Sequence, residues 1–212
     1  LLRSPLDRIR ILGESGGRID DEADDVALML LPKGKADAGE GGWARKGARR
    51  LLVMRIKYLA YFHSALLSLT ELWRFVNASD EALIVSLTEM GLCGREDIAG
   101  PAAAMRSTFN EAPKQFEAYR AECIEALAAF GPGSALGQAT SANEVDFGAM
   151  KHRPMTVYLT VPSSKLGVAA PWIALILNHA IEAVAAETGP APVRFLVDEF
   201  ALGAAPRGGD PH

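Results

Sequence analysis

The sequence has little of what thiol or metal chemistry needs. Its 212 residues include two cysteines, Cys93 and Cys123, which lie far apart and form no Cys-x-x-Cys pair. Of the four histidines, His63, His152 and His179 follow no ligand spacing. These absences exclude a disulfide scaffold and a cysteine-based zinc site, and they are typical of a protein in a reducing compartment.

Long apolar runs and a strong net charge are also missing. The longest apolar stretch, Ala169 to Leu177, includes Pro171 and is far shorter than the roughly 20 residues that cross a bilayer. The net charge of −4 argues against a globally basic nucleic-acid binder and leaves a local basic surface open. Because the chain starts at Leu1 without a signal-peptide layout, we expect an internal piece of a longer protein with no membrane span of its own.

What the sequence does contain is a long helical pattern. Between residues 43 and 130, apolar side chains recur every three or four positions, which predicts a run of helices. Trp43 is placed in the apolar stripe of the first of these helices. Ser68-Leu69-Thr70-Glu71 has the form of a capping box, and Ser79 is a predicted N-cap. Pro101 and Pro113 are each predicted to begin a helix, because proline is tolerated at the first helical position.

Five carboxylates lie within the six residues from Asp20 to Asp25. They suit either a metal site or the start of a helix, where the dipole favours negative charge. We favour the helix start, because neither a histidine nor a spaced ligand follows.

After Ser134 the pattern changes. The β-branched and aromatic segments Met155–Val161 and Val193–Phe200 are typical of buried strands, and an apolar helix is predicted between them from Pro171 through Ala186. Strand, helix and strand in this order form a βαβ unit, which predicts a parallel sheet.

The second of these strands ends in Asp198 and Glu199, the form of a Walker B element. At the carboxyl end of a parallel strand, Asp198 would hold Mg²⁺ through its water shell and Glu199 would activate the attacking water. Alternatively, the two acids only end the strand. The phosphate-binding partner motif is absent, since residues 131–138 lack its lysine, so we expect this chain alone to bind ATP weakly or not at all and not to hydrolyse it.

A second signal is a basic run in an otherwise acidic chain. Between Trp43 and Phe62 there are six cations and no acid, namely Arg45, Lys46, Arg49, Arg50, Arg55 and Lys57. The first four share two helical turns. They indicate either a sequence-independent contact with DNA phosphates or an exposed helix face paired with acids from elsewhere.

Several segments together resemble the TraG/TraD-type coupling proteins of type IV secretion systems, over about residues 2–203. The strand Met155–Pro162, with Leu166 and Ala170-Pro171 after it, and the Walker B stretch Pro192–Ala201 are the specific pieces. Ser4–Asp7 is similar to the family's Asn-Pro-Leu-Asp entry, and Trp43–Leu52 is similar to the opening of its all-α domain. The Walker A loop and the transmembrane helices of the family are missing, and residues 204–210 do not resemble its continuation.

The resemblance implies an α/β RecA-like (P-loop NTPase) fold, present in part, with an inserted all-α domain. We expect residues 1–23 and 138–212 in the nucleotide-binding domain and residues 24–137 in the all-α domain. The full-length protein would be a hexameric ATPase at the cytoplasmic face of the bacterial inner membrane, with ATP and Mg²⁺ as cofactors and neither bound to this piece.

Such an ATPase would deliver relaxase-bound single-stranded DNA, or effector proteins, to the secretion channel. Two alternatives stay open: a helical module that docks a protein partner without a nucleotide or DNA role, and a different RecA-like DNA translocase of the FtsK type.

Overall fold

The computed structural model describes residues 6–33, 42–140, 145–161 and 166–196. The chain divides into two compact units, Leu1–Glu144 and Val145–His212. The predicted domain boundaries after residues 23 and 137 stay predictions.

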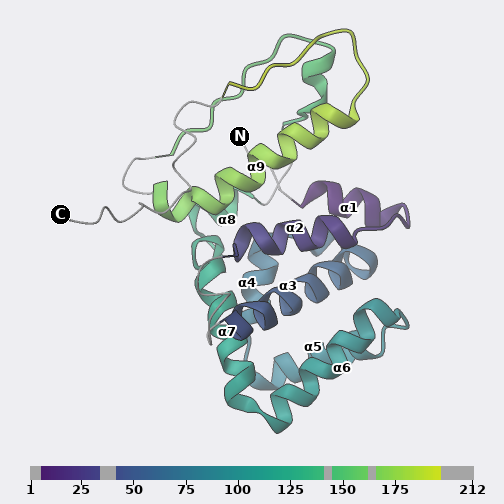
Figure 1. The fold of residues 1–212 in the computed structure, drawn as a ribbon, viewed down its shortest axis with the longest axis vertical. Coiled ribbons are helices and arrows are strands. Elements are labelled where there is room, and N and C mark those ends of the chain that lie inside the picture. Colours follow the sequence, from purple (N-terminus) through teal and green to yellow (C-terminus); the bar gives the residue numbers. More distant parts are fainter. Residues whose placement is uncertain (1–5, 34–41, 141–144, 162–165, 197–212) are drawn as a thin grey trace, which may run out of the picture. The chain divides into compact units, whose positions relative to one another are not determined.

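The first unit is built from helices (Figure 1). In chain order its described elements are α1 (Asp7–Glu14), α2 (Asp20–Leu30), α3 (Gly42–Phe62), the 3₁₀ turn η2 (Ser64–Leu66), α4 (Leu69–Val76), α5 (Asp80–Gly91), α6 (Glu96–Glu111), α7 (Pro113–Leu127), the 3₁₀ turn η3 (Ala128–Phe130) and α8 (Ala135–Ala139).

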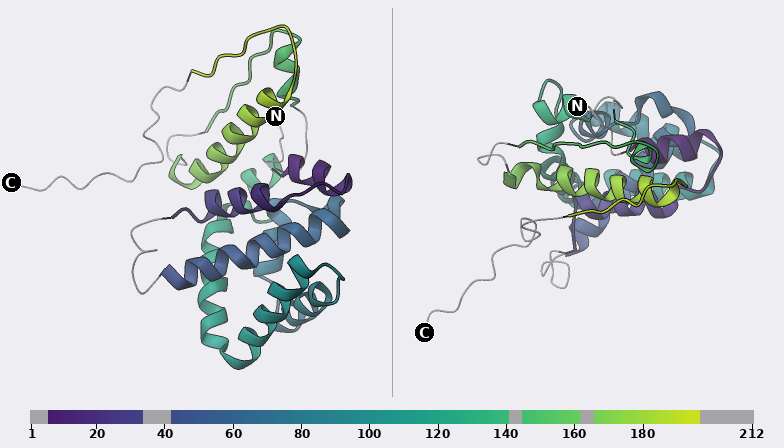
Figure 2. Two further views of the ribbon diagram at one scale, coloured as in Figure 1. Left: turned by 45° about the vertical axis from the view of Figure 1, so that its right-hand side comes forward. Right: turned by 90° about the horizontal axis from the view of Figure 1, so that it is seen from above.

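Helix α3 is the centre of this unit. It packs against α1, α2, α4, α6 and α7, and Figure 2 shows α1 and α2 along one side of it and α5 and α6 on the other. Its apolar side chains are almost fully buried over the middle of the helix, at Leu51, Leu52, Met54, Ile56 and Leu59. Because neighbouring helices enclose α3, each of its polar side chains must either form a hydrogen bond or ion pair or extend to solvent. Its polar residues are therefore the first place to look for a binding site.

Local signals place several helix ends correctly. The Oγ atoms of Ser68 and Ser79 accept hydrogen bonds from the backbone N–H groups of Glu71 and Ala82, at 3.1 and 3.3 Å, which confirms both predicted N-caps. Helix α7 begins at Pro113 and α2 begins at Asp20, as predicted.

The prediction for Pro101 was wrong, because this proline lies inside α6. Two acids, Glu96 and Asp97, occupy the first turn of that helix and favour its earlier start. The buried face also begins before the proline, at Ile98, and continues through Ala102. Burial of this face outweighs the backbone hydrogen bond that proline cannot donate.

The second unit contains the 3₁₀ turn η4 (Gly148–Lys151) and the long helix α9 (Leu166–Ala186). Helix α9 begins five residues before the predicted start at Pro171. Two non-helical segments, residues 154–161 and 191–196, run beside α9 (Figures 1 and 2).

The α/β RecA-like fold class was therefore wrong for this chain: the described residues form helices and contain no β-strand. The predicted strand Met155–Val161 and the described part of the second, Val193 to Leu196, do not pair. At their base, the N–H of Ala191 donates to the carbonyl of Lys151 at 3.2 Å. Beyond that point the two segments line a cavity beside α9 and form no ladder. Their side chains are half-buried or exposed, with Tyr158 and Leu196 the most open to solvent.

Candidate nucleic-acid interface

The predicted nucleotide site falls outside the described part of the chain. Both the catalytic candidate, Glu199, and the magnesium candidate, Asp198, lie in the segment 197–212, which the structure does not describe. Among the described residues, no group of His, Cys, Asp and Glu side chains is arranged to hold a metal ion. The ATP and Mg²⁺ assignments stay predictions.

The basic run on α3, in contrast, is described completely. Its cations fall into two groups, those held within the helical unit and those exposed to solvent. Arg45 donates from Nε to Glu122 Oε2 on α7 at 3.1 Å, so part of its charge is neutralised within the unit. Arg49 is partly buried. Arg55 lies over the ring of Phe75, at 4.8 Å from the centroid, and burial lowers the pKa of its guanidinium. These three cations are held against the helical core.

Lys57 is the most enclosed of the six cations, with a side chain only 7% exposed. Its Nζ lies 2.6 Å from Asp20 Oδ1 on α2 and 2.6 Å from Asp97 Oδ2 on α6. Burial alone would lower the pKa of Lys57, but the hydrogen bonds to the two carboxylates outweigh it, and the net pKa is raised. The same ammonium lowers the pKa of Asp20 and, against the effect of burial, that of Asp97. This cluster is a structural clamp between three helices.

Lys46 and Arg50 differ from the other cations. Both side chains are exposed, and the described residues provide no ion-pair partner for either. They are four residues apart on α3, so they lie on one face of the helix about 6 Å apart along its axis. Of the predicted contact residues Arg45, Lys46, Arg49 and Arg50, these two are the ones available to an anionic ligand.

The two free cations border a small cleft of about 180 Å³ between α3, α6 and α7. Met105 and Tyr119 are buried at its base, whereas Trp43 is 49% exposed. The rings of Trp43 and Tyr119 meet edge to face, with centroids 5.7 Å apart and planes at 65°. The full lining consists of Trp43, Lys46, Gly47, Arg50, Ala104, Met105, Thr108 and Tyr119.

Gly47 makes this arrangement of rings possible. A Cβ at this position would lie 2.2 Å from Cε1 of Tyr119, so any other residue would displace the phenol ring. The Nε2 of Gln115 donates a hydrogen bond to the Tyr119 hydroxyl. The Tyr119 side chain is thus held by the close approach of Gly47 to its ring and by the hydrogen bond to its hydroxyl, and its ring packs against the exposed indole of Trp43.

Sequence reasoning missed the cleft because it placed Trp43 in the apolar stripe of the helix. A usable signal was nevertheless present: Trp43, Lys46, Gly47 and Arg50 follow the i, i+3, i+4, i+7 spacing of one helix face. An aromatic residue, a glycine and two cations on one face are unusual for a core-facing stripe. The contribution of Tyr119, 72 positions after Gly47, has no such local signal.

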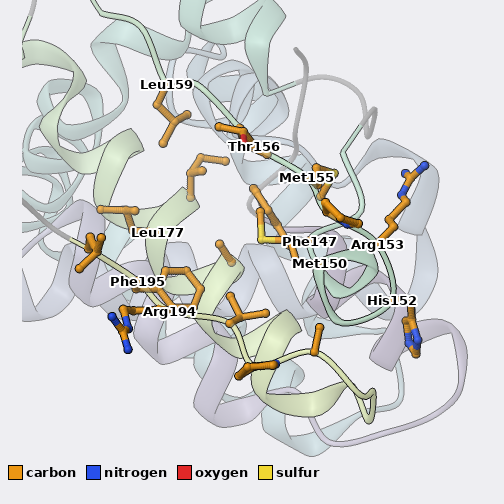
Figure 3. Close-up of a pocket in the computed structure, with 18 residues that line it drawn as sticks. Phe147, Met150, His152, Arg153, Met155, Thr156, Leu159, Leu177, Arg194 and Phe195 are labelled. Carbon is orange, nitrogen blue, oxygen red and sulfur yellow. The ribbon is translucent and has the colours of Figure 1, made fainter.

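The second unit holds a larger cavity, of about 630 Å³, between α9 and the two non-helical segments (Figure 3). Apolar side chains form most of its lining, among them Phe147, Met150, Leu159 and Leu177. Arg153 and Arg194 lie at its edges with their charged ends turned away (Figure 3). The lining therefore provides apolar contacts but few polar or charged groups that could bind a ligand or take part in a reaction.

Helix α9 is apolar along most of its length. Residues Ala169–Ala186 have a mean hydropathy of 1.4 and are long enough to cross a membrane by length and composition, a test that the core helix of a soluble protein also passes.

Comparison of the chain with protein-family models, with curated proteins and with solved structures finds no match. The resemblance to coupling proteins therefore stays a prediction.

Proposed function

We propose that the first unit binds the phosphate backbone of single-stranded DNA without reading its sequence. The observation that carries this proposal is the pair Lys46 and Arg50, which is exposed and without an ion-pair partner among the described residues. The other cations of the same helix are packed against aromatic rings, acids or the core. A free pair one helical turn apart is suited to successive phosphate groups of one strand.

The overall acidity of the chain supports a localised contact. With a net charge of −4, the molecule as a whole repels a polyanion, so binding would concentrate where the cations are uncompensated. Phosphate contacts of this kind position a strand and carry no sequence information. Such a contact is what a transfer protein needs when it must accept whatever strand is delivered to it.

In a coupling protein of type IV secretion, this contact would hold the transferred strand on the helical domain. The contact needs neither Asp198 nor Glu199, because neutralising phosphates requires no nucleotide chemistry. It can therefore be tested on this chain apart from any ATPase activity.

The test compares two double variants of the 212-residue chain, Lys46→Gln/Arg50→Gln and the charge-matched control Arg18→Gln/Arg74→Gln. The control removes two cations that lie outside the cleft, beside Asp20 and Glu71. Binding of fluorescein-labelled oligo-dT is followed by anisotropy over a series of salt concentrations.

We expect the Lys46→Gln/Arg50→Gln variant to bind oligo-dT about tenfold more weakly at low salt. The slope of log binding constant against log salt concentration should become shallower by about 1.4, since each phosphate that is no longer neutralised removes roughly 0.7. The control should keep the slope of the wild type. Equal affinity and slope in all three proteins would refute the proposal and favour a helical module that docks a protein partner.

A further inference from the structure

We infer that the cleft beside Lys46 and Arg50 takes one unpaired nucleobase, stacked on Trp43, so that the first unit selects single-stranded over duplex DNA. This inference rests on the proposed function and adds a subsite to it. It commits to a flat aromatic ring as the occupant, with its phosphates outside the cleft on the two cations.

The exposed indole is the first argument. Trp43 leaves 49% of its surface open although a cleft adjoins it, and Tyr119 holds it from one side at 5.7 Å. An indole that is fixed in position and open to solvent loses little freedom when a second ring stacks on it. Stacking of bases on aromatic side chains is sequence-tolerant, because every base has a π-face.

The size of the cleft is the second argument. Its volume of about 180 Å³ is below the range of roughly 300–1,000 Å³ that is typical of sites for whole small molecules. One heterocyclic ring is of suitable size, whereas a complete nucleotide is not. The base formed by Met105 and the ring of Tyr119 is largely apolar and suits the face of a ring.

The polar groups are the third argument. The hydroxyl of Thr108 donates to the carbonyl of Ala104 at 2.9 Å, so within the cleft it offers only an acceptor. Lys46 and Arg50 stand on the same helix face as Trp43. A base in the cleft would thus leave its own phosphate beside a cation, while few groups remain to distinguish one base from another.

Selection against duplex DNA follows from access. A paired base is stacked on both faces and must be turned out of the helix before it can meet Trp43. An unpaired base enters without that cost. Duplex DNA would therefore retain only the phosphate contacts with Lys46 and Arg50.

The experiment uses the full 212-residue chain and three probes of equal length: oligo-dT, an abasic strand with the same phosphates, and a hairpin duplex. We expect wild-type protein to bind oligo-dT about tenfold more tightly than the abasic strand, with equal salt slopes. Trp43→Ala should remove that difference and leave affinity for the duplex unchanged. Trp43→Phe, which keeps a ring, should preserve most of it.

A second readout needs no change at the cleft. In a Trp73→Phe/Trp172→Phe background, Trp43 is the remaining indole, and its fluorescence should be quenched by oligo-dT but not by the abasic strand. Equal affinity for these two strands together with absent quenching would overturn the base subsite. If Lys46→Gln/Arg50→Gln still weakened binding in that case, the phosphate contact would stand without the cleft, and if it did not, both proposals would be wrong.

Discussion

Both halves of α3 carry cations, but the first half leaves two of its four exposed, whereas the second half encloses both of its own. In the first half, Lys46 and Arg50 extend into solvent beside a cleft. In the second half, Lys57 is enclosed between two carboxylates and Arg55 lies over two aromatic rings. The difference comes from the neighbours. In the second half, α2 and α6 bring two acids to Lys57. In the first half, the acid that α7 brings pairs with Arg45, and the face of Lys46 and Arg50 meets an apolar wall from α6 and α7. A run of like charges in sequence is therefore not evidence of one continuous surface.

The strongest way to break this comparison is to remove the enclosed cation. Lys57→Met should lower the free energy of unfolding by about 2–3 kcal/mol, because Asp20 and Asp97 are left without their shared partner. The loss is smaller than for a fully buried pair, since both carboxylates reach solvent. Urea unfolding measures it in a Trp172→Phe background, where fluorescence reports the first unit alone.

The matched control is Lys114→Met, at an exposed lysine near the start of α7. It should change the free energy of unfolding by less than about 0.5 kcal/mol. Similar losses in both variants would show that Lys57 is no clamp.

Low pH should weaken the ion pairs of Lys57, in the second half of α3. Asp20 and Asp97 have lowered pKa values in the folded state, so their stabilising effect is complete above their ordinary value of 3.8 and is lost as the pH falls through the lowered values. Asp24 acts in the opposite direction, because burial raises its pKa.

At the alkaline end, the raised pKa of Lys57 keeps its effect complete below 10.5 and loses it only above the raised value. The urea midpoint of the wild type should therefore exceed that of Lys57→Met between about pH 5 and 10 and converge with it in acid. A difference that persists unchanged at pH 2 would contradict an electrostatic clamp.

A change at Gly47 tests the first half. Gly47→Ala places a methyl group 2.2 Å from the Tyr119 ring, and we expect a net loss of about 1 kcal/mol after the better helix propensity of alanine is counted. Gly100→Ala is the control, because α6 leaves open space there and alanine should stabilise it by up to about 1 kcal/mol. If both substitutions stabilised the protein, Gly47 and the ring of Tyr119 would not be in close contact.

The smallest effect on stability should come from the free cations themselves. Lys46→Gln/Arg50→Gln should alter the free energy of unfolding by less than about 0.5 kcal/mol while it weakens DNA binding. The same urea experiment measures it. A loss as large as that of Lys57→Met would mean that the two halves of α3 do not differ in the way described.

Sequence reasoning succeeded where the signal is local and failed where it depends on a partner. The caps at Ser68 and Ser79 and the start at Pro113 depend on a few consecutive residues, and they were predicted correctly. The segment Met155–Val161 has the composition of a strand, but a strand also needs a neighbour in register, which composition does not supply. Whether Lys46 and Lys57 are exposed or buried likewise depends on helices that lie far away in the chain.

The clamp on Lys57 also bears on the kinetics of folding. Asp20 precedes Lys57 by 37 residues and Asp97 follows it by about 40, so both ion pairs close long loops. Contacts of this kind form late, after the local helices are in place. An interaction absent from the transition state acts mainly on the rate of unfolding. The clamp would then lengthen the lifetime of the folded helical unit while leaving its speed of folding nearly unchanged.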